Sequence, residues 1–521
     1  MPKMNAVKSS IDEELLKQSY LYTFILGLVA HGYSFMNMIV SHDSLNDFYA
    51  TNPWIKSEFG RIFYSIYITL TRGRIVVPWL IGVFALIWIS IAVYYVLQIF
   101  QIKKSSMRFL VAGIFVCNPT VYALAATYIH DLDADMLAMM LSVVSAFLWY
   151  RGVEKREKST SVLYMFAGAL ILSISMGIYQ SYISLAIVLI MLISIKSVLE
   201  NQKFLEVLKK GIQGIVMIMS SAIFYMLEVK IFSLLTGVAP MERDTYNSLG
   251  NIELVFTGNI FEKIFNVYVN CFGAFRKLFL SSYPEIISFI IHGILVIGII
   301  GIILWGMKSI DWKSKCLIIV LGIFMPFAMN ISHLLNNGVG HVLMHYAVWM
   351  VYLLALILIV WFEKEIGVSK TIKQVVAGVL MLCVLISIGQ NIQTANVVYV
   401  KKNLEYQSTL SYMTRVVNKM EEHEEYVSGE TPVLFIGDES IGIRRVGFEK
   451  YFIITGADTT SPITYYDIYE NYFEYVLGTH IALYYDEKLE NDARVQEMPV
   501  FPKAGCAQMI DGIMVVKLNE N

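Results

Sequence analysis

Eleven long apolar runs constrain what this 521-residue chain can fold into. A helix needs about 20 mostly apolar residues to cross the hydrocarbon core of a bilayer. Runs of this kind lie near 21–41, 78–100, 109–128, 134–150, 161–179, 182–197, 212–236, 286–306, 316–332, 343–362 and 374–391. Only 16% of the residues are charged, against about 25% in soluble domains. The sequence therefore predicts a mainly α-helical, polytopic protein of about eleven transmembrane helices in a lipid bilayer.

Charge is distributed unevenly along the chain. Residues 391–521 contain 20 acidic and 11 basic residues, while the whole chain has a net charge of only −2. A net charge near zero with no basic domain argues against a nucleic-acid partner, and the five scattered cysteines form no CxxC pair. We expect three regions: an N-terminal segment (1–20), a transmembrane domain (21–391) and an acidic C-terminal domain (392–521).

The basic residues predict the orientation in the membrane. If the N-terminus is cytoplasmic, 20 of the 29 Lys and Arg residues before residue 391 fall on the cytoplasmic side, and every short loop there is basic. Positive loops stay on the cytoplasmic side of a membrane. The N-terminus is therefore predicted to be cytoplasmic, and eleven spans then put the C-terminal domain on the extracytoplasmic side.

The C-terminal domain is predicted to be a small α/β unit. Residues 400–426 read as a helix, and 432–438, 451–456 and 480–486 read as short strands bounded by Gly, Asp and Pro. No nucleotide-binding or hydrolase motif occurs there, so a binding or lid role is the modest interpretation.

Two groups of carboxylates lie at the predicted outer face. Asp43 directly follows the first span, and Asp131, Asp133 and Asp135 follow the third span within IHDLDAD. They could be ordinary solvated loop charges. However, ionisable groups close to membrane depth are costly and tend to be functional. Converging carboxylates suit a general base, or a divalent cation such as Mg²⁺ or Mn²⁺ at Asp131 and Asp133, although no cofactor is certain.

Five further residues are candidates for substrate binding. Arg61 and Arg74 lie in the first long loop, where a guanidinium could clamp a phosphate or simply reach the interface. Tyr179 and Gln180 form a tight turn, either as an aromatic anchor with a turn residue or as hydrogen-bond donors to a ligand. Glu228 lies in the seventh span near Lys230, and at least one of these two should face a cavity or a partner on another helix.

Three histidines cluster in a further loop. His341 and His345 are four residues apart at the start of a predicted helix and should share one face, and His333 is nearby. A metal site is conceivable, but no HExxH-like pattern supplies the rest. Hydrogen bonds to substrate and satisfied buried imidazoles are the other interpretations.

The order of these features resembles a known family. Asp43 follows the first span, a loop then closes on Gly60-Arg61 or Gly73-Arg74, and CNPTVYALAATYIHDLDADMLAMMLSVVSAFLWY and LSISMGIYQSYISL follow. Over roughly residues 20–200 this resembles the serotype-converting Gtr type II O-antigen glucosyltransferases, bacterial membrane proteins of the wider GT-C class.

The resemblance implies an inverting hexosyltransferase of the bacterial cytoplasmic (inner) membrane. The donor would be undecaprenyl-phosphate glucose or a related hexose, and the acceptor a hydroxyl of a cell-surface or cell-wall polysaccharide on the outer side. Asp43 matches the functional acidic residue of the first external loop, with Asp131 and Asp133 as further acidic residues and Arg61 or Arg74 neutralising the phosphate. A lipid-linked glycan flippase, or a polymerase or ligase using diphosphate-linked glycans, are the alternatives.

Overall fold

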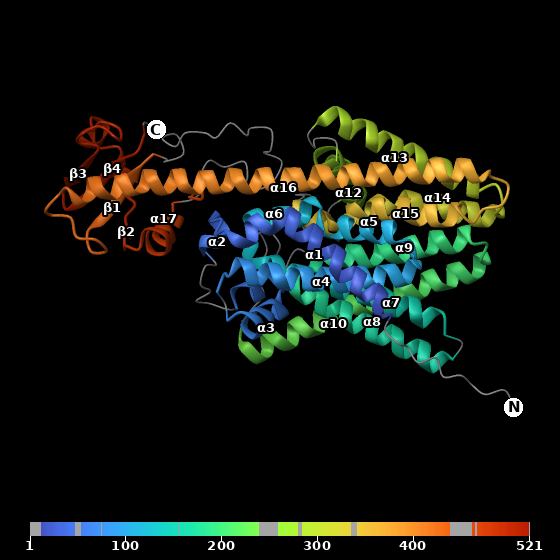
Figure 1. Ribbon diagram of the computed structural model, residues 1–521. Helices are drawn as coiled ribbons and strands as arrows, with labels where there is room; N and C mark the ends of the chain where they lie inside the picture. Colours follow the sequence, from blue (N-terminus) through green and yellow to red (C-terminus); the bar gives the residue numbers. More distant parts are fainter. Residues whose placement is uncertain are drawn as a thin grey trace.

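The computed structural model describes residues 12–46, 54–73, 75–155, 157–238, 259–279, 284–334, 341–437, 461–463 and 466–519. Their main feature is a bundle of long helices beside one much longer helix, α16, which carries a small sheet at its far end (Figure 1).

Long helices make up the bundle. Its first part contains α1 (Glu13–Met36), α4 (Pro78–Phe100), α5 (Ser105–Val116), α6 (Pro119–Thr127), α7 (Leu132–Val153), α8 (Lys158–Ile178), α9 (Ile183–Leu199) and α10 (Phe204–Thr236). Its second part contains α12 (Ile260–Phe279), α13 (Glu285–Gly306), α14 (Trp312–Met329), α15 (Met350–Phe362) and α16 (Lys370–Glu421).

Short helices connect the long ones at the end of the bundle where the functional candidates lie. They are α2 (His42–Asn46), η1 (Ile55–Phe59), α3 (Ile62–Thr71), η2 (Ile129–Asp131), η3 (Gln180–Tyr182), η4 (Ile331–Leu334) and η5 (Val342–Trp349).

The helices confirm a multi-pass membrane protein. Among the described residues, nine helices are long and apolar enough to cross a bilayer, and the bent pair α5–α6 would make a tenth span. The predicted count of eleven is not confirmed, because α1 is not among these helices. Its apolar run is interrupted by polar residues such as His31 and Ser34, which are buried.

The break between α5 and α6 follows from two residues, Asn118 and Pro119. The Asn118 side chain accepts a hydrogen bond from the Val121 backbone N–H and so caps α6, and Pro119 occupies its first turn. Proline removes a helical hydrogen bond and favours the start of a helix. The two helices consequently meet at 42°.

Close packing joins α1 to its neighbours α4, α5 and α16. A Cβ at Gly27 would lie 2.3 Å from the end of the Leu86 side chain of α4, so glycine leaves room for Leu86 to pack against α1. His31 is fully buried, with Nδ1 2.7 Å from the Tyr399 hydroxyl and Nε2 2.7 Å from the Val116 carbonyl. It thereby links α1 to both α16 and α5.

Helix α16 connects the bundle to the C-terminal region. Its 52 residues correspond to roughly 78 Å at 1.5 Å per residue, and in Figure 1 it runs along the bundle and continues past it. The last predicted span (374–391) and most of the predicted helix (400–426) form this one helix, and the expected domain limit at 391/392 falls inside it.

The C-terminal region contains a four-stranded sheet. Its strands are β1 (Pro432–Ile436), β2 (Ala482–Leu483), β3 (Ala507–Ile510) and β4 (Ile513–Lys517), in the order β2-β1-β4-β3. β1 pairs in parallel with β2 and β4, and β3–β4 form a hairpin whose turn residues, Asp511 and Gly512, both have positive φ. β1 and β2 lie within two predicted strands, 451–456 lies outside the described residues, and β3–β4 were not predicted.

This region also contacts the short helix that follows α1. Helices α17 (Ile468–Tyr472), α18 (Glu487–Glu490) and α19 (Ala493–Gln496) and the turn η8 (Phe473–Leu477) accompany the sheet. α17 packs on α2, Asn471 Nδ2 donates to Asn46 Oδ1 at 3.0 Å, and Leu45 belongs to the apolar core of the C-terminal region. The C-terminal region therefore covers the helix that carries Asp43.

Candidate functional site

Three aspartates mark one end of the bundle, which we call the acidic end. α6 stops at Thr127, η2 makes a tight connection, and α7 begins at Leu132, so Asp131 occupies the N-cap position of α7 and Asp133 and Asp135 its first turn. A helix N-terminus is a favourable place for negative charge. All three residues are buried, with exposed fractions of 6%, 0% and 3%. They are not ordinary solvated loop charges.

Asp131 is held by two cations from the preceding loop. Lys56 of η1 lies with Nζ 2.5 Å from Asp131 Oδ1, and Arg61 at the start of α3 lies with Nη1 3.9 Å from Oδ2. His130 Nε2 is 3.5 Å from the same oxygen. Lys56 also lies over the Tyr64 ring, 4.6 Å from its centroid.

Asp133 forms a fully buried ion pair with Arg72. Arg72 Nε donates to Oδ2 at 3.2 Å and Nη2 to Oδ1 at 3.4 Å, and both side chains are at most 2% exposed. The same guanidinium donates to the carbonyls of Ile75 and His130. This fork-shaped contact ties the end of α3 to the start of α7.

Asp135 lies two residues after Asp133, in the same first turn of α7, and completes the group. Its carboxylate interacts electrostatically with Asp131, Arg61 and Lys56. With Arg72 paired to Asp133, the group contains three carboxylates and three cations, so its formal charge is balanced.

Asp43 is more open than these aspartates. Its side chain is 37% exposed, and among the described residues its one ion-pair partner is His42, with Nε2 3.4 Å from Oδ2. The His42 ring packs edge-on against Tyr128, which contacts both His130 and His341. Two aromatic side chains thus connect Asp43 to the residue next to Asp131, and both predicted acidic groups lie at one end of the bundle.

His341 faces the same aromatic side chain, with its Nε2 3.4 Å from the Tyr128 hydroxyl. Burial, together with the positive charge of the nearby Arg61 and His42, lowers the pKa of His341 to about 4. The imidazole is therefore neutral at pH 7 and can accept or donate one hydrogen bond at each nitrogen.

The Tyr179-Gln180 turn positions the first loop. Gln180 Nε2 donates to the Phe59 carbonyl at 2.7 Å and to the Tyr225 hydroxyl at 2.8 Å. Arg61 lies over the Tyr179 ring, 4.5 Å from its centroid. The turn therefore fixes the backbone before Arg61, and the face of the Tyr179 ring packs against the Arg61 guanidinium.

Glu228 lies away from the acidic group, on α10. It accepts a hydrogen bond of 2.8 Å from the Ser173 hydroxyl of α8, which confirms the prediction of a partner on another helix. Lys230, two residues on, is exposed.

The three histidines do not form the expected helical face. His341 caps a 3₁₀-helix, η5, instead of starting an α-helix. With three residues per turn, positions four apart no longer share a face, so the prediction that His341 and His345 align was wrong. The His345 ring instead packs against the His333 ring, with the centroids 5.1 Å apart.

Two cations that contact the aspartates were missed by sequence reasoning, and one chosen cation lies outside the described residues. Arg74 lies outside the described residues, whereas Lys56 and Arg72 make the contacts to Asp131 and Asp133. No local signal separates Arg72 from Arg74 in RGR. Only the register of α3 decides which of them reaches α7.

The acidic group does not fit a divalent cation. Asp131 and Asp133 already face Lys56 and Arg72, and a metal ion would have to displace these side chains. Across the described ranges, no cluster of three or more His, Cys, Asp or Glu residues has metal-binding geometry.

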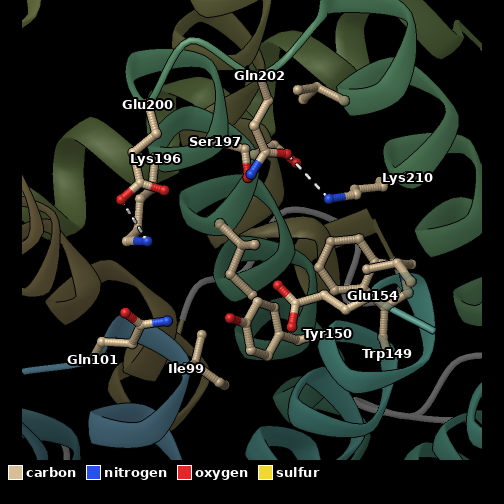
Figure 2. A pocket seen from close by; sticks show the side chains of 14 residues that line it. Ile99, Gln101, Trp149, Tyr150, Glu154, Lys196, Ser197, Glu200, Gln202 and Lys210 are labelled. Atoms are coloured by element: carbon tan, nitrogen blue, oxygen red, sulfur yellow. Dashed lines mark hydrogen bonds and ion pairs between the residues drawn. The ribbon is translucent and has the colours of Figure 1, made fainter. Parts of the chain in front are cut away.

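A separate pocket of about 110 Å³ lies between the C-terminal ends of α7 and α9, away from the acidic end (Figure 2). Its charged side chains are largely paired: Lys196 with Glu200 at 2.9 Å, and Lys210 with the Gln202 amide oxygen at 3.1 Å. Because it is separated from Asp131 by the length of α7, it is not part of the acidic end.

Comparison with known proteins identifies one family. The model of the family described as Glucosyl transferase GtrII matches residues 32–362, more than half of the chain and all the candidate residues above. No curated protein and no solved structure matches the chain.

Proposed function

The chain belongs to the glucosyl transferase GtrII family, and on this premise we propose that it transfers a hexose from a polyprenyl-phosphate donor to a polysaccharide hydroxyl, with inversion. The donor is undecaprenyl-phosphate glucose or a related hexose. The acidic end lies on the outer side of the bacterial cytoplasmic membrane, with the N-terminus inside and the C-terminal region outside.

The observation that carries this proposal is the pair of cations on Asp131. Transfer leaves a lipid phosphate, whose charge must be stabilised as the bond to the anomeric carbon breaks. At 3.9 Å, the contact of Arg61 with Asp131 is too long for a hydrogen bond, so its guanidinium keeps N–H groups for the phosphate. Lys56 supplies the second positive charge beside it.

Asp43 is the proposed base. Asp131 and Asp133 are engaged by cations of the chain itself, whereas Asp43 is partly exposed and contacts only His42 among the described charged groups. In an inverting transfer the acceptor hydroxyl oxygen attacks the anomeric carbon, its proton passes to the carboxylate, and the phosphate leaves with the bonding electron pair. Asp43 takes that proton, and Lys56 and Arg61 receive the phosphate.

A donor assay tests the proposal. The purified protein in lipid nanodiscs is incubated with undecaprenyl-phosphate glucose and an acceptor glycan, and both lipid phosphate and glucosylated glycan are measured. We expect them to appear in equal amounts. Reaction only with a diphosphate-linked glycan would indicate a polymerase or ligase. In proteoliposomes, movement of the intact lipid-linked sugar across the bilayer without phosphate release would indicate a flippase, and either result overturns the proposal.

A further inference from the structure

Four buried side chains beside the acidic end contain polar atoms with no hydrogen-bond partner in the described part of the chain. The atoms are both ring nitrogens of His333 and of His345, the amide nitrogen and oxygen of Asn330, and the hydroxyl of Tyr182. Their residues are at most 5% exposed. Buried polar groups are nearly always paired, so seven unpaired atoms in one region call for an explanation.

Three of these side chains come from the short helices η3, η4 and η5, and Asn330 directly precedes η4. The rings of His333 on η4 and His345 on η5 are 5.1 Å apart and tilted by 41°. The Ser181 hydroxyl of η3 donates to the Ser332 hydroxyl and to the Met344 carbonyl, both at 3.3 Å. Each of these contacts involves the residue next to a histidine of the pair. The backbone is thus fixed while the imidazoles stay unpaired.

Tyr182 connects this group to the proposed phosphate site. Its ring packs against Tyr179 at 5.8 Å, and Arg61 lies over Tyr179. Its hydroxyl interacts electrostatically with Asp135. The unpaired groups therefore lie next to the residues that are expected to hold the donor phosphate.

Packing alone does not account for these imidazoles, because two other buried imidazoles of the same chain have a partner at each ring nitrogen. His292 of α13 has Nδ1 2.6 Å from the Ser288 carbonyl and Nε2 2.6 Å from the Tyr352 hydroxyl. His31 likewise has a partner at each nitrogen. The difference indicates that His333 and His345 are left open for a ligand.

We propose that His333, His345, Asn330 and Tyr182 form a subsite for the neutral, hydroxyl-rich sugar unit of the substrate. An amide, a phenol and a neutral imidazole each contain both a donor and an acceptor, and so does every sugar hydroxyl. A phosphate group offers only acceptors and would leave half of these atoms unpaired. Burial lowers the pKa of His333 to about 4, so this ring is uncharged at neutral pH. The proposal rests on the proposed function, because it assigns the sugar of that same reaction.

Isosteric apolar variants test the subsite. In Asn330→Leu and His345→Leu the unpaired polar atoms are removed, so the melting temperature of the ligand-free protein should stay the same or rise. The KM for the polyprenyl-phosphate hexose should rise about tenfold, since each lost buried hydrogen bond has an effect of this order. His292→Leu is the matched control: it should lower the melting temperature and leave KM unchanged.

Binding of methyl glucoside separates this proposal from the proposed function. Saturation-transfer NMR with the reconstituted protein should detect the glucoside with the wild type and not with Asn330→Leu. A wild type that binds the glucoside but releases no lipid phosphate contradicts only the proposed function. The subsite would be overturned if the wild type and the variants had equal KM and equal glucoside binding. It would also be overturned if a metal chelator lowered the melting temperature of the wild type only, because these side chains would then hold a metal ion.

Discussion

Asp43 differs from the other aspartates of the acidic end in the groups that hold it. Asp131 and Asp133 each contact a Lys or Arg side chain, and Asp133 is completely buried. Asp43 lies on the short helix α2, with more than a third of its side chain exposed. This contrast supports the proposed division of tasks between residues of the same type: proton acceptance by Asp43, and organisation of the cations by Asp131 and Asp133.

Replacement of the base gives the first prediction. Asp43→Asn should lower the rate of sugar transfer by about 10²–10⁴-fold, the usual contribution of a general base, without changing expression or melting temperature. The assay is release of lipid phosphate by purified protein. Asp311→Asn is the control, because Asp311 caps α14 at the other end of the bundle and asparagine caps a helix equally well. Near-normal transfer by Asp43→Asn would remove this residue from the mechanism.

The buried ion pair gives the second prediction. Asp133→Asn leaves the Arg72 guanidinium buried without its countercharge, which should lower the free energy of unfolding by about 3–5 kcal/mol. Thermal unfolding in detergent measures the loss. The double variant Arg72→Met/Asp133→Leu should recover much of it, because no unpaired charge remains. A single variant as stable as the wild type would mean that the pair does not hold α3 on α7.

Two histidines near the acidic end, the buried His333 and the half-buried His341, predict how stability depends on pH. Burial lowers the pKa of His333 and of His341 from 6.5 to about 4, so the unfolded chain binds more protons than the folded one between these values. Their contribution is fully present above pH 6.5 and is lost as the pH falls toward 4. The melting temperature should fall across this range in the wild type and less steeply in His333→Leu. Parallel curves would contradict the assigned burial.

At the scale of elements, the η3 turn and the preceding Tyr179 hold the loop around Phe59–Arg61 in place. Gln180 holds the Phe59 carbonyl, and Tyr225 of α10 donates to the Gly60 carbonyl at 3.2 Å. Both contacts fix the backbone directly before Arg61. Gln180 is therefore a positioning residue that acts through Arg61.

Its replacement gives the fourth prediction. Gln180→Leu should reduce kcat about tenfold or more, because a displaced charge loses most of its effect on the leaving phosphate, with a smaller change in KM for the acceptor. Gln180→Glu should restore little, since a carboxylate cannot donate to the Phe59 carbonyl. If Gln180→Leu loses glucoside binding as strongly as it loses kcat, Gln180 instead contacts the sugar directly.

The sequence predicts the apolar elements better than the site. Most spans, the first strand of the sheet and the acidic turn follow from local patterns, because hydrophobicity and Gly or Pro positions determine them. The partners of the aspartates depend on how α3 crosses α7, which no local pattern encodes, so Arg72 and Lys56 could not be chosen in advance. Likewise, the 3₁₀ geometry of η5 results from tertiary packing, and it separates His341 from His345.

At the scale of the whole molecule, α16 couples the bundle to the C-terminal region. Asn396 donates to the Val29 carbonyl at 3.1 Å and Asn403 to the Tyr33 hydroxyl at 3.0 Å, so the helix is fixed to α1 on its way out of the bundle. The sheet region at its end returns to α2 through Asn471 and α17. Because α2 carries Asp43, the C-terminal region borders the proposed base. This placement is consistent with the binding or lid role expected from the sequence.

The orientation of the molecule gives the last prediction. Lys488 of α18 and Lys364, which follows α15, are both exposed and lie on opposite sides of the bundle along α16. In a Cys316→Ser background, which removes the exposed native thiol, Lys488→Cys should react with a membrane-impermeant thiol reagent on intact cells. Lys364→Cys should react only after the cytoplasmic membrane is permeabilised. The reverse pattern would place the acidic end in the cytoplasm, where an extracellular glycan acceptor could not reach Asp43.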